Sequence, residues 1–369
     1  MKTKKFLSVL LLLSALLLII NVEVKSCMSF RIAAEDGCII VGRTMEFRLD
    51  LDFNIVYIPR NYEIISYKSD NTESLKWKTK YCYVGVNSFN QFEALNEGMN
   101  EAGLAVSALW FEKNNKYQLV EKNDTPKSIG HAYLVSWLLG NFSNVEEVKN
   151  AIKNMTIYGD FIPELGFVPP FHYIVYDKKG GCIVIEVENG IKNIYDNPLG
   201  VFTNSPNFPW HITNLRQYIG ISPNKLDEKK FSGIDFGTTG NGSGMFGLPG
   251  DFSPPSRFVR LVFFTQYAHK PKNAKAALNL ALHITNDFDI FKGMITDSKP
   301  EGAGESADET TQWSTFKDLT NSIFYYRTYD NLDIRYIDLK ELNPNDKSPR
   351  MFDFNEDEQI FYNMTRKLK

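Results

Sequence analysis

An apolar run near the N-terminus fixes where a folded domain of this chain can begin. The run covers residues 6–22, follows three lysines within residues 2–5, and precedes the tripeptide Val-Lys-Ser at 24–26. This arrangement is typical of a secretory signal peptide with a cleavage site after Ser26. We therefore expect residues 1–26 to be removed, residues 27–369 to form a single domain, and the mature protein to be secreted or periplasmic.

Two other interpretations of the same segment are kept as alternatives. A run of about 17 apolar residues is at the short limit for a membrane span, so an uncleaved N-terminal anchor is one of them. A lipoprotein signal is the other, because a cysteine follows the expected cut. Lys25 fits a lipobox poorly, and a lipid would block the thiol of Cys27. If the cut is made as expected, nothing in the mature sequence predicts stable association with a membrane.

Cleavage after Ser26 would make Cys27 the first residue of the mature chain. Its thiol and its free α-amine would then sit on the same Cα, so that one residue supplies both a nucleophile and a base. In the uncleaved chain the same nitrogen is an amide and cannot act as a base. The position of the cut therefore predicts an N-terminal nucleophile that is activated by its own processing.

Composition excludes several other classes of function. The formal net charge is −3 and the sequence has no basic stripe, so we expect no nucleic-acid partner. No CxxC or HExxH motif is present, so we expect no metal and no cofactor. Aromatic residues make up 14% of the chain, which suits a large core and an apolar pocket. Cys38, Cys82 and Cys182 lie in strand-like runs and are expected to be buried, although a disulfide between two of them stays possible.

Alternation of apolar and polar residues begins directly after Cys27. Residues 28–34 alternate as a strand does, Glu35-Asp36-Gly37 has the composition of a hairpin turn, and residues 38–42 form a second apolar run. An antiparallel hairpin of this kind returns the chain to its starting level. It should therefore bring Arg43 and Glu46 close to Cys27.

The rest of the chain alternates between groups of strands and groups of helices. Strands are expected at 53–59, 77–86, 104–111, 172–176, 182–187, 200–203, 311–316, 322–327 and 332–338. Helices are expected at 126–140, 145–153 (capped by Ser143), 256–267 and 273–288. Loops or turns are expected at 60–78, 96–103 and 236–254. This order predicts an α+β fold in which two stacked antiparallel sheets are covered by helices on both outer faces.

Five segments of the sequence resemble those of one known family. They are Cys27 with GRTMEF at 42–47, GMNEAGL at 98–104, FTNSP at 202–206, GLPGD at 247–251 with SRF at 256–258, and TQW at 311–313 with YRTY at 326–329. In this order they resemble the choloylglycine hydrolases, the family that contains conjugated bile acid hydrolases and penicillin V acylases. The resemblance implies the four-layer αββα fold of N-terminal-nucleophile hydrolases and extends over most of the chain after Cys27.

The resemblance also implies roles for five residues. Cys27 matches the nucleophile, and Arg43 matches an arginine beside the thiol, where a positive charge favours the thiolate. Glu46 matches a position, often aspartate, that interacts with the α-amine. Asn204 matches the side chain that forms an oxyanion hole together with a backbone N–H. Arg257 matches a second arginine that orients catalytic groups.

Two aromatic residues are expected to bind substrate. Trp110 stands where Gram-positive bile-salt hydrolases often have asparagine and some penicillin acylases have tyrosine, and in this respect it resembles the Gram-negative branch of the family. Its indole should form an apolar pocket wall rather than act in catalysis, and Phe47 should lie beside it. The resemblance leaves the choice of substrate open.

The function implied is hydrolysis of an amide between a bulky apolar acyl group and a small polar amine, without a cofactor. Conjugated bile acids are the first candidate substrates, followed by penicillin V and N-acyl-homoserine lactones. The resemblance also implies a homo-oligomer, commonly a tetramer. Three alternatives from other readings of the residues are a non-catalytic binding module, a surface ion pair between Arg43 and Glu46, and a Cys/His dyad that uses one of the five histidines.

Overall fold

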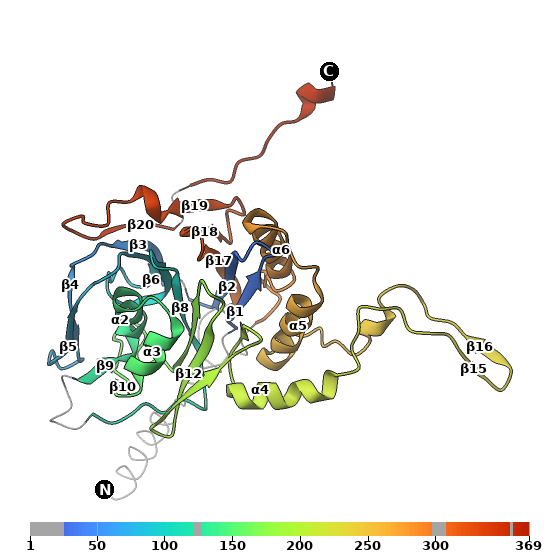
Figure 1. Cartoon of the computed structure of the whole chain (residues 1–369), viewed down its shortest axis with the longest axis horizontal. Helices are drawn as coiled ribbons and strands as arrows, with labels where there is room; N and C mark the ends of the chain where they lie inside the picture. Colours follow the sequence, from blue (N-terminus) through green and yellow to red (C-terminus); the bar gives the residue numbers. More distant parts are fainter. Residues whose placement is uncertain (1–25, 50, 121–126, 297–307, 355–356, 369) are drawn as a thin grey trace, which may run out of the picture.

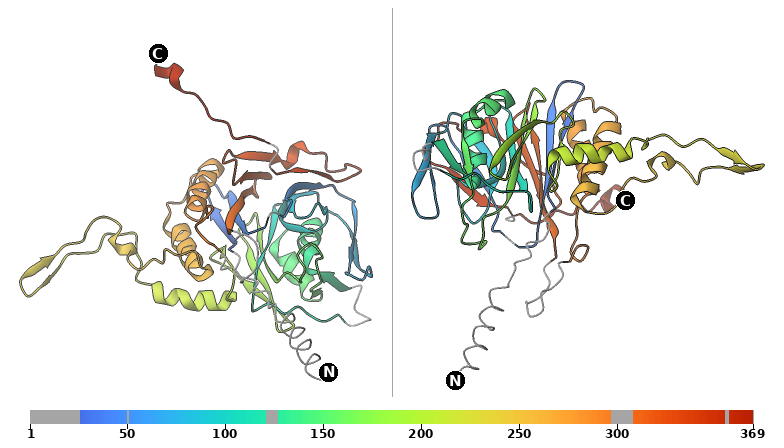
Figure 2. Two further views of the ribbon diagram at one scale, coloured as in Figure 1. Left: turned by 180° about the vertical axis from the view of Figure 1, so that it is seen from behind. Right: turned by 90° about the horizontal axis from the view of Figure 1, so that it is seen from below.

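Two antiparallel sheets packed face to face form the centre of the molecule, and helices cover both outer faces (Figure 1). The computed structural model describes residues 26–49, 51–120, 127–296, 308–354 and 357–368. Figure 2 shows the two sheets between the two helical layers. The predicted α+β sandwich is thus confirmed, whereas the expected signal segment lies almost entirely outside the described residues.

The six-stranded sheet carries the N-terminal hairpin at its centre. Its order is β14 (Val201–Phe202), β1 (Met28–Ala33), β2 (Ile39–Phe47), β17 (Thr310–Asp318), β18 (Ile323–Thr328) and β19 (Arg335–Asp338). The predicted turn joins β1 to β2, with Gly37 at φ 85°, a conformation that glycine adopts readily. Met28 pairs with Thr44 and Ser29 with Arg43, so the hairpin returns to the level of Cys27 as expected.

The eight-stranded sheet faces it. Its order is β13 (Ile191–Asp196), β12 (Cys182–Glu188), β11 (Phe171–Asp177), β8 (Leu104–Trp110), β7 (Leu95–Asn100), β6 (Tyr83–Asn87), β3 (Asn54–Ile58) and β20 (Arg350–Asp353). Along β8, Ala105 and Leu109 join the apolar cluster between the sheets, whereas Leu104 and Val106 join a second cluster on the outer face. The centre of this sheet is therefore buried on both faces, which explains why β8, with the sequence LAVSALW, is almost continuously apolar.

Two pairs of helices cover the outer faces. Helices α2 (Leu134–Asn141) and α3 (Val145–Ile152) pack on the eight-stranded sheet, and α5 (Pro254–Tyr267) and α6 (Ala274–Asn286) pack on the six-stranded sheet. Asn144 caps α3 by accepting a hydrogen bond from the backbone N–H of Glu147. Ser143, the predicted cap, instead donates its hydroxyl to the Glu147 carboxylate. Within the described residues, no helix has both the length and the apolar character needed to cross a membrane.

Two segments expected to be irregular are strands. The polar stretch 60–78 contains a hairpin of β4 (Glu63–Tyr67) and β5 (Glu73–Lys78). The single strand expected at 77–86 is therefore divided, because its first residues belong to β5 and its later residues to β6. The expected turn at 96–103 is mostly β7, and only residues 101–103 turn. Gly98 misled the prediction: a Cβ there would lie 2.5 Å from the carbonyl oxygen of Val84, so this glycine permits close strand contact rather than a turn.

Other boundaries also differ from the prediction. The helix expected at 126–140 begins only at Leu134, because residues 128–130 form β9 (Ser128–Gly130), parallel to β10 (Thr156–Tyr158), before a 3₁₀ turn, η2 (His131–Tyr133). The short helix α4 (Phe208–Asn214) was not predicted. Cys27, Cys38, Cys82 and Cys182 are all buried and free, so no disulfide joins them.

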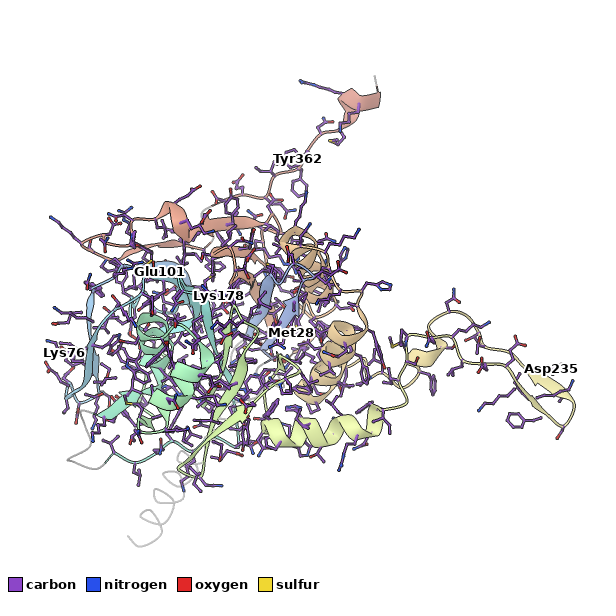
Figure 3. The ribbon with its side chains drawn as sticks, in the orientation of Figure 1. Met28, Lys76, Glu101, Lys178, Asp235 and Tyr362 are labelled. Carbon is purple, nitrogen blue, oxygen red and sulfur yellow. The ribbon has the colours of Figure 1, made fainter. Side chains whose placement is uncertain are left out.

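An arm formed by residues 219–249 projects far from the body (Figure 1). Near its outer end, β15 (Lys229–Phe231) pairs with β16 (Ile234–Phe236), and Figure 3 shows Asp235 at the tip. Phe231, Ile234 and Phe236 are between 53% and 61% exposed. Part of this segment was expected to be a loop; the hairpin and its exposed apolar side chains were not predicted.

Candidate active site

Cys27 lies directly before β1, at the centre of the body, where Figure 3 shows its neighbour Met28. It is only 3% exposed, and its sulfur lies 3.6 Å from the sulfur of Met45 on the paired strand β2. Ser26, still attached in the full chain, donates its backbone N–H to the carboxylate of Glu309 at 2.5 Å. The structure therefore shows the site before the expected cut.

Two residues distant in sequence, Asn204 and Arg257, hold the backbone of Cys27. Its N–H donates to Oδ1 of Asn204 at 2.9 Å, and its carbonyl oxygen accepts from Nη1 of Arg257 at 2.8 Å. Nη2 of Arg257 donates to the same Oδ1 at 2.7 Å. Because Oδ1 accepts two hydrogen bonds, the orientation of the amide is determined by its partners, and Nδ2 donates to the carbonyl of Trp110 at 2.9 Å.

Two neutral histidines fix the backbone on either side of Asn204. Nε2 of His211 donates to the Asn204 carbonyl at 2.8 Å, and Nε2 of His172 donates to the Thr203 carbonyl at 3.0 Å. Burial lowers the pKa of both rings, to about 4 for His211. Nδ1 of His172 meets Glu186 at 3.1 Å, and burial raises the pKa of that carboxyl to about 8. A protonated Glu186 can therefore donate to Nδ1, which leaves the ring proton on Nε2.

Glu46 is almost fully buried beside this group. Its Oε1 accepts a hydrogen bond of 3.0 Å from the hydroxyl of Thr311, which faces it across the β2–β17 pair. Its Oε2 has no hydrogen-bond partner among the described residues. Burial raises the pKa of Glu46 to about 8, although the positive charge of Arg257 opposes the shift. In the uncleaved chain the Glu46 carboxyl is therefore protonated near neutral pH, and a cation beside Oε2 would favour its carboxylate form.

Arg43 points the other way, into the space between the sheets. Nη2 donates to the carbonyl of Ala108 at 2.7 Å, and Nη1 lies 3.5 Å from the carboxylate of Glu97. The interpretation of Arg43 and Glu46 as a surface ion pair is wrong, because both are at most 1% exposed. They are three residues apart on one strand, so their side chains leave opposite faces of the sheet.

Several opposing effects act on the pKa of the Cys27 thiol, and burial is the largest of them. Burial and the negative charge of Glu46 raise the pKa of the thiol. The positive charges of Arg43 and Arg257 and a hydrogen bond from the Glu46 backbone lower it. The net result is a raised pKa. In the uncleaved chain the thiol is therefore protonated near neutral pH, and forming the thiolate requires a base.

A cavity of about 220 Å³ opens above the thiol. Its lining includes Cys27, Arg43 and the apolar side chains Met45, Phe47, Leu51, Phe89, Trp110, Leu165 and Phe171. Trp110 meets Phe47, Phe167 and Phe171 edge to face, with ring centroids 5.8–6.1 Å apart. The same residue joins the cavity wall to Asn204 through its carbonyl oxygen.

All seven residues singled out in the sequence lie at this site: Cys27, four residues around it, and two residues in the cavity wall. Sequence reasoning missed His172, His211 and Thr311, which hold these residues in place. Only the motif containing Thr311 offered a signal, whereas the two histidines are single residues in apolar surroundings. No histidine is hydrogen-bonded to Cys27 in the described structure, and no group of three or more His, Cys, Asp and Glu residues suited to a metal occurs within the described residues.

Comparisons with known proteins agree with this geometry. Residues 27–352 match the family model for linear amide C–N hydrolases of the choloylglycine hydrolase family. A bile salt hydrolase/transferase of Clostridium perfringens is 33% identical over 332 residues, which are 89% of this chain and 97% of the relative. A crystal structure of a variant conjugated bile acid hydrolase from the same organism, 32% identical, superposes with a TM-score of 0.80 over 91% of this chain and 99% of the other. Penicillin V acylase from Agrobacterium tumefaciens, 22% identical, shares the fold over 89% of this chain and 91% of its own, with a TM-score of 0.72.

Proposed function

Since the chain belongs to the choloylglycine hydrolase family of linear amide C–N hydrolases, we propose that it releases glycine or taurine from conjugated bile acids. The observation that carries this proposal is the position of the Cys27 thiol at an apolar cavity, beside Arg43 and Asn204. A bulky apolar acyl group suits such a cavity. The 33% identity to a bile salt hydrolase/transferase supports the choice over penicillin V, since the acylase relative is only 22% identical.

The reaction begins with removal of residues 1–26. The nitrogen of Cys27, now hydrogen-bonded to Asn204 as an amide, becomes an amine, and the charge of Glu46, which already acts on the Cys27 thiol, can balance its ammonium form. The amine takes the thiol proton, and the thiolate forms a C–S bond to the substrate carbonyl carbon. The second N–H of Asn204 Nδ2 and a backbone N–H stabilise the oxyanion. A precursor in which this cut is blocked should fold and remain inactive.

The second half of the reaction releases both products. Collapse of the tetrahedral intermediate breaks the C–N bond, and the leaving amine receives the proton held by the α-ammonium group. Water then attacks the thioester, gives a proton to the α-amine, and the thiol leaves with that proton as the acid is released. The cycle uses the substrate, water, the thiol and α-amine of Cys27, and the groups that stabilise the oxyanion.

The test compares the mature protein with Cys27→Ser on a panel of glycine and taurine conjugates, penicillin V and an N-acyl-homoserine lactone. We expect release of glycine or taurine by the wild type and a loss of about 1,000-fold or more in the variant, with an unchanged circular dichroism spectrum. Equal activity of the variant would refute the mechanism. Preferential release of phenoxyacetate from penicillin V would refute bile acid conjugates as the substrate but would leave the mechanism standing.

The state of the N-terminus separates an enzyme from a lipoprotein or a non-catalytic binding module. We propose export to the periplasm or the exterior with cleavage after Ser26, on the basis of the pattern at 1–26. N-terminal sequencing and intact mass should show an unmodified Cys27 as the first residue. A lipid on Cys27 would exclude catalysis by its thiol.

We also propose that the chain forms a homo-oligomer through the arm at 219–249. The support is the exposure of Phe231, Ile234 and Phe236 on a hairpin that projects from the body, since apolar patches of this kind commonly mark protein contacts. Replacing the three residues by serine should lower the mass measured by light scattering. A wild type that is already monomeric would refute this assignment without affecting the proposed reaction.

A further inference from the structure

His172 and Glu186 form a buried pair beside the backbone that leads into Asn204, and the reaction described above gives this pair no part. Both side chains are fully buried, His172 on β11 and Glu186 on the neighbouring strand β12. Phe111 stacks on the imidazole with ring centroids 4.5 Å apart, and Phe202 packs against it at 4.1 Å. Because two aromatic rings pack against it, the imidazole keeps its orientation, and each ring nitrogen keeps its neighbour.

The hydrogen bonds of the pair show that the two side chains share one proton. Nε2 of His172 lies 3.0 Å from the carbonyl oxygen of Thr203, which can only accept, so Nε2 carries a hydrogen. Nδ1 lies 3.1 Å from Oε1 of Glu186, and one further proton joins these two atoms. Burial raises the pKa of Glu186 to about 8 and lowers the pKa of His172, so this proton belongs to the carboxyl. Oε2 of Glu186 accepts the backbone N–H of Phe208 at 3.2 Å.

The charged and titratable groups around the pair come from four elements. Glu188, on the same strand β12, raises the pKa of Glu186 further through its negative charge. Tyr195 on β13 has a raised pKa and stays a neutral phenol, in part because of Glu186. His211 on α4 is neutral, since burial and the charge of Arg257 on α5 lower its pKa. The negative charge of Glu188 therefore favours the protonated form of Glu186 at neutral pH.

Removal of the shared proton would break the contact with Thr203. When Glu186 gives its proton to solvent, the ring proton leaves Nε2 and Nδ1 becomes protonated, because Nδ1–H can then form a charge-assisted hydrogen bond to the carboxylate. Nε2 is left with a lone pair toward the Thr203 carbonyl oxygen, and two acceptors 3.0 Å apart repel. Thr203 directly precedes Asn204, whose Oδ1 is bonded to Cys27 and Arg257. The change therefore reaches the amide assigned to the oxyanion hole.

We propose that His172 and Glu186 are positioning residues for the oxyanion hole: their shared proton holds the backbone at Thr203 and Asn204, and loss of this proton slows the reaction. The inference rests on the proposed function for the reaction, and it concerns the placement of Asn204 rather than the choice of substrate. A misplaced oxyanion donor weakens binding of the transition state, so kcat should fall about tenfold while KM changes by less than about threefold.

The kinetic test compares mature wild type, Glu186→Gln and Glu188→Gln, each with itself at pH 7 and at pH 9.5. In Glu186→Gln the amide N–H donates to Nδ1 at every pH, so the ring proton stays on Nε2. Cys27 and Glu46 titrate in all three proteins, so the ratio of kcat at pH 7 to kcat at pH 9.5, divided by the same ratio in Glu186→Gln, isolates the pair. We expect about 10 for this quotient in the wild type.

Glu188→Gln is the matched control, because it removes a carboxylate from the same strand without touching the shared proton. It should keep the alkaline loss of kcat and move it to lower pH, since the charge that raises the pKa of Glu186 is gone. A quotient of 1 in the wild type, with the same alkaline loss in Glu186→Gln, would overturn the proposal.

A spectroscopic test separates this inference from the proposed reaction. Nitrogen NMR of the histidine rings in mature Cys27→Ser protein reports which ring nitrogen carries the proton. One histidine should change from Nε2–H at pH 6.5 to Nδ1–H at pH 9.5, and the midpoint of this change should move to lower pH in Glu188→Gln, which identifies His172.

The two tests fail in different ways. If no conjugate is hydrolysed, the proposed reaction fails, but the change of ring proton would still support the pair and its contact with Thr203. The NMR measurement needs no substitution of Glu186, so it decides the matter even if Glu186→Gln does not fold. A ring proton that stays on Nε2 at both pH values in every histidine would overturn the proposal.

Discussion

Two buried glutamates on facing sheets, Glu46 and Glu97, show how the same residue type serves opposite purposes. Both are at most 1% exposed. Glu97 accepts hydrogen bonds from Lys317 at 2.5 Å, from Ser107 at 3.1 Å and from Thr315, and its carboxylate also lies 3.5 Å from the guanidinium of Arg43. Glu46 accepts one side-chain hydrogen bond, from Thr311, and its second oxygen has none within the described residues.

The pKa values of the two carboxyls diverge accordingly. Burial acts to raise the pKa of Glu97, but Lys317, Arg43 and the hydrogen bonds outweigh it, so the pKa is lowered. Burial dominates at Glu46 and raises its pKa to about 8. The difference teaches that Glu97 is part of a completed structural cluster, whereas at Glu46 the charge of Arg257 does not outweigh burial, so a second cation is needed to stabilise the carboxylate. The α-ammonium group formed by cleavage after Ser26 can supply that cation.

The largest expected effect comes from opening the completed cluster. Glu97→Leu would leave Arg43 and Lys317 buried without a counter-charge, and we expect the free energy of unfolding to fall by about 3–5 kcal/mol. Urea unfolding at pH 7 measures this change. Glu63→Leu removes one partner of the exposed pair with Lys76 and serves as the control, for which no measurable change is expected. A small effect of Glu97→Leu would show that the cluster is not structural.

The corresponding change at Glu46 should affect activity rather than stability. Glu46→Gln keeps the volume and the hydrogen bond to Thr311 but cannot carry the negative charge that balances an α-ammonium group. We expect kcat/KM of the mature enzyme to fall about 100-fold, while the free energy of unfolding at pH 7 falls by less than about 1 kcal/mol. Steady-state kinetics and urea unfolding of the same preparation test both halves. Wild-type kinetics would remove Glu46 from the mechanism.

In the uncleaved chain, the opposite pKa shifts of Glu46 and Glu97 should make the free energy of unfolding depend on pH in opposite directions. The folded pKa of Glu46 is raised above its usual value of 4.5, so its contribution is present at low pH and is lost as pH rises toward about 8. The folded pKa of Glu97 is lowered, so its contribution is present above pH 4.5 and is lost as pH falls. Glu46→Gln should therefore remove a decline of about 2 kcal/mol between about pH 5.5 and 7, measured by urea unfolding. After cleavage this decline should shrink, and its persistence would argue against an ammonium–Glu46 contact.

The smallest expected effects come from two threonines on β17 that serve the two glutamates. Thr311 donates to Glu46 and Thr315 donates to Glu97. Replacing either by valine should lower the free energy of unfolding by about 1–2 kcal/mol, because one hydrogen bond to a buried carboxyl is lost. Only Thr311→Val should also lower kcat, by about 3–10-fold. Equal effects of the two variants on kcat would contradict the assignment of Glu46 to catalysis and Glu97 to structure.

Local pattern determined much of the fold. Alternation at 28–34, the turn ending in Gly37 and the apolar run after it were sufficient to predict the hairpin that brings Arg43 and Glu46 to Cys27. Local pattern failed where a residue's role depends on a distant strand. Gly98 was taken for a turn residue, although it is a strand glycine that lies against the Val84 carbonyl.

The candidate site followed from the sequence only through the resemblance of its motifs, because its contacts are non-local. The hydrogen bonds from Cys27 to Asn204, from Arg257 to Cys27 and from Thr311 to Glu46 join residues 177, 230 and 265 positions apart. Periodicity assigns a side chain to a face of a strand, but the register between strands and the packing of two sheets decide which side chains meet. For that reason the sequence by itself identified Cys27 and its hairpin. The tertiary structure alone decided that Arg43 pairs with Glu97 and that two histidines hold the backbone around Asn204.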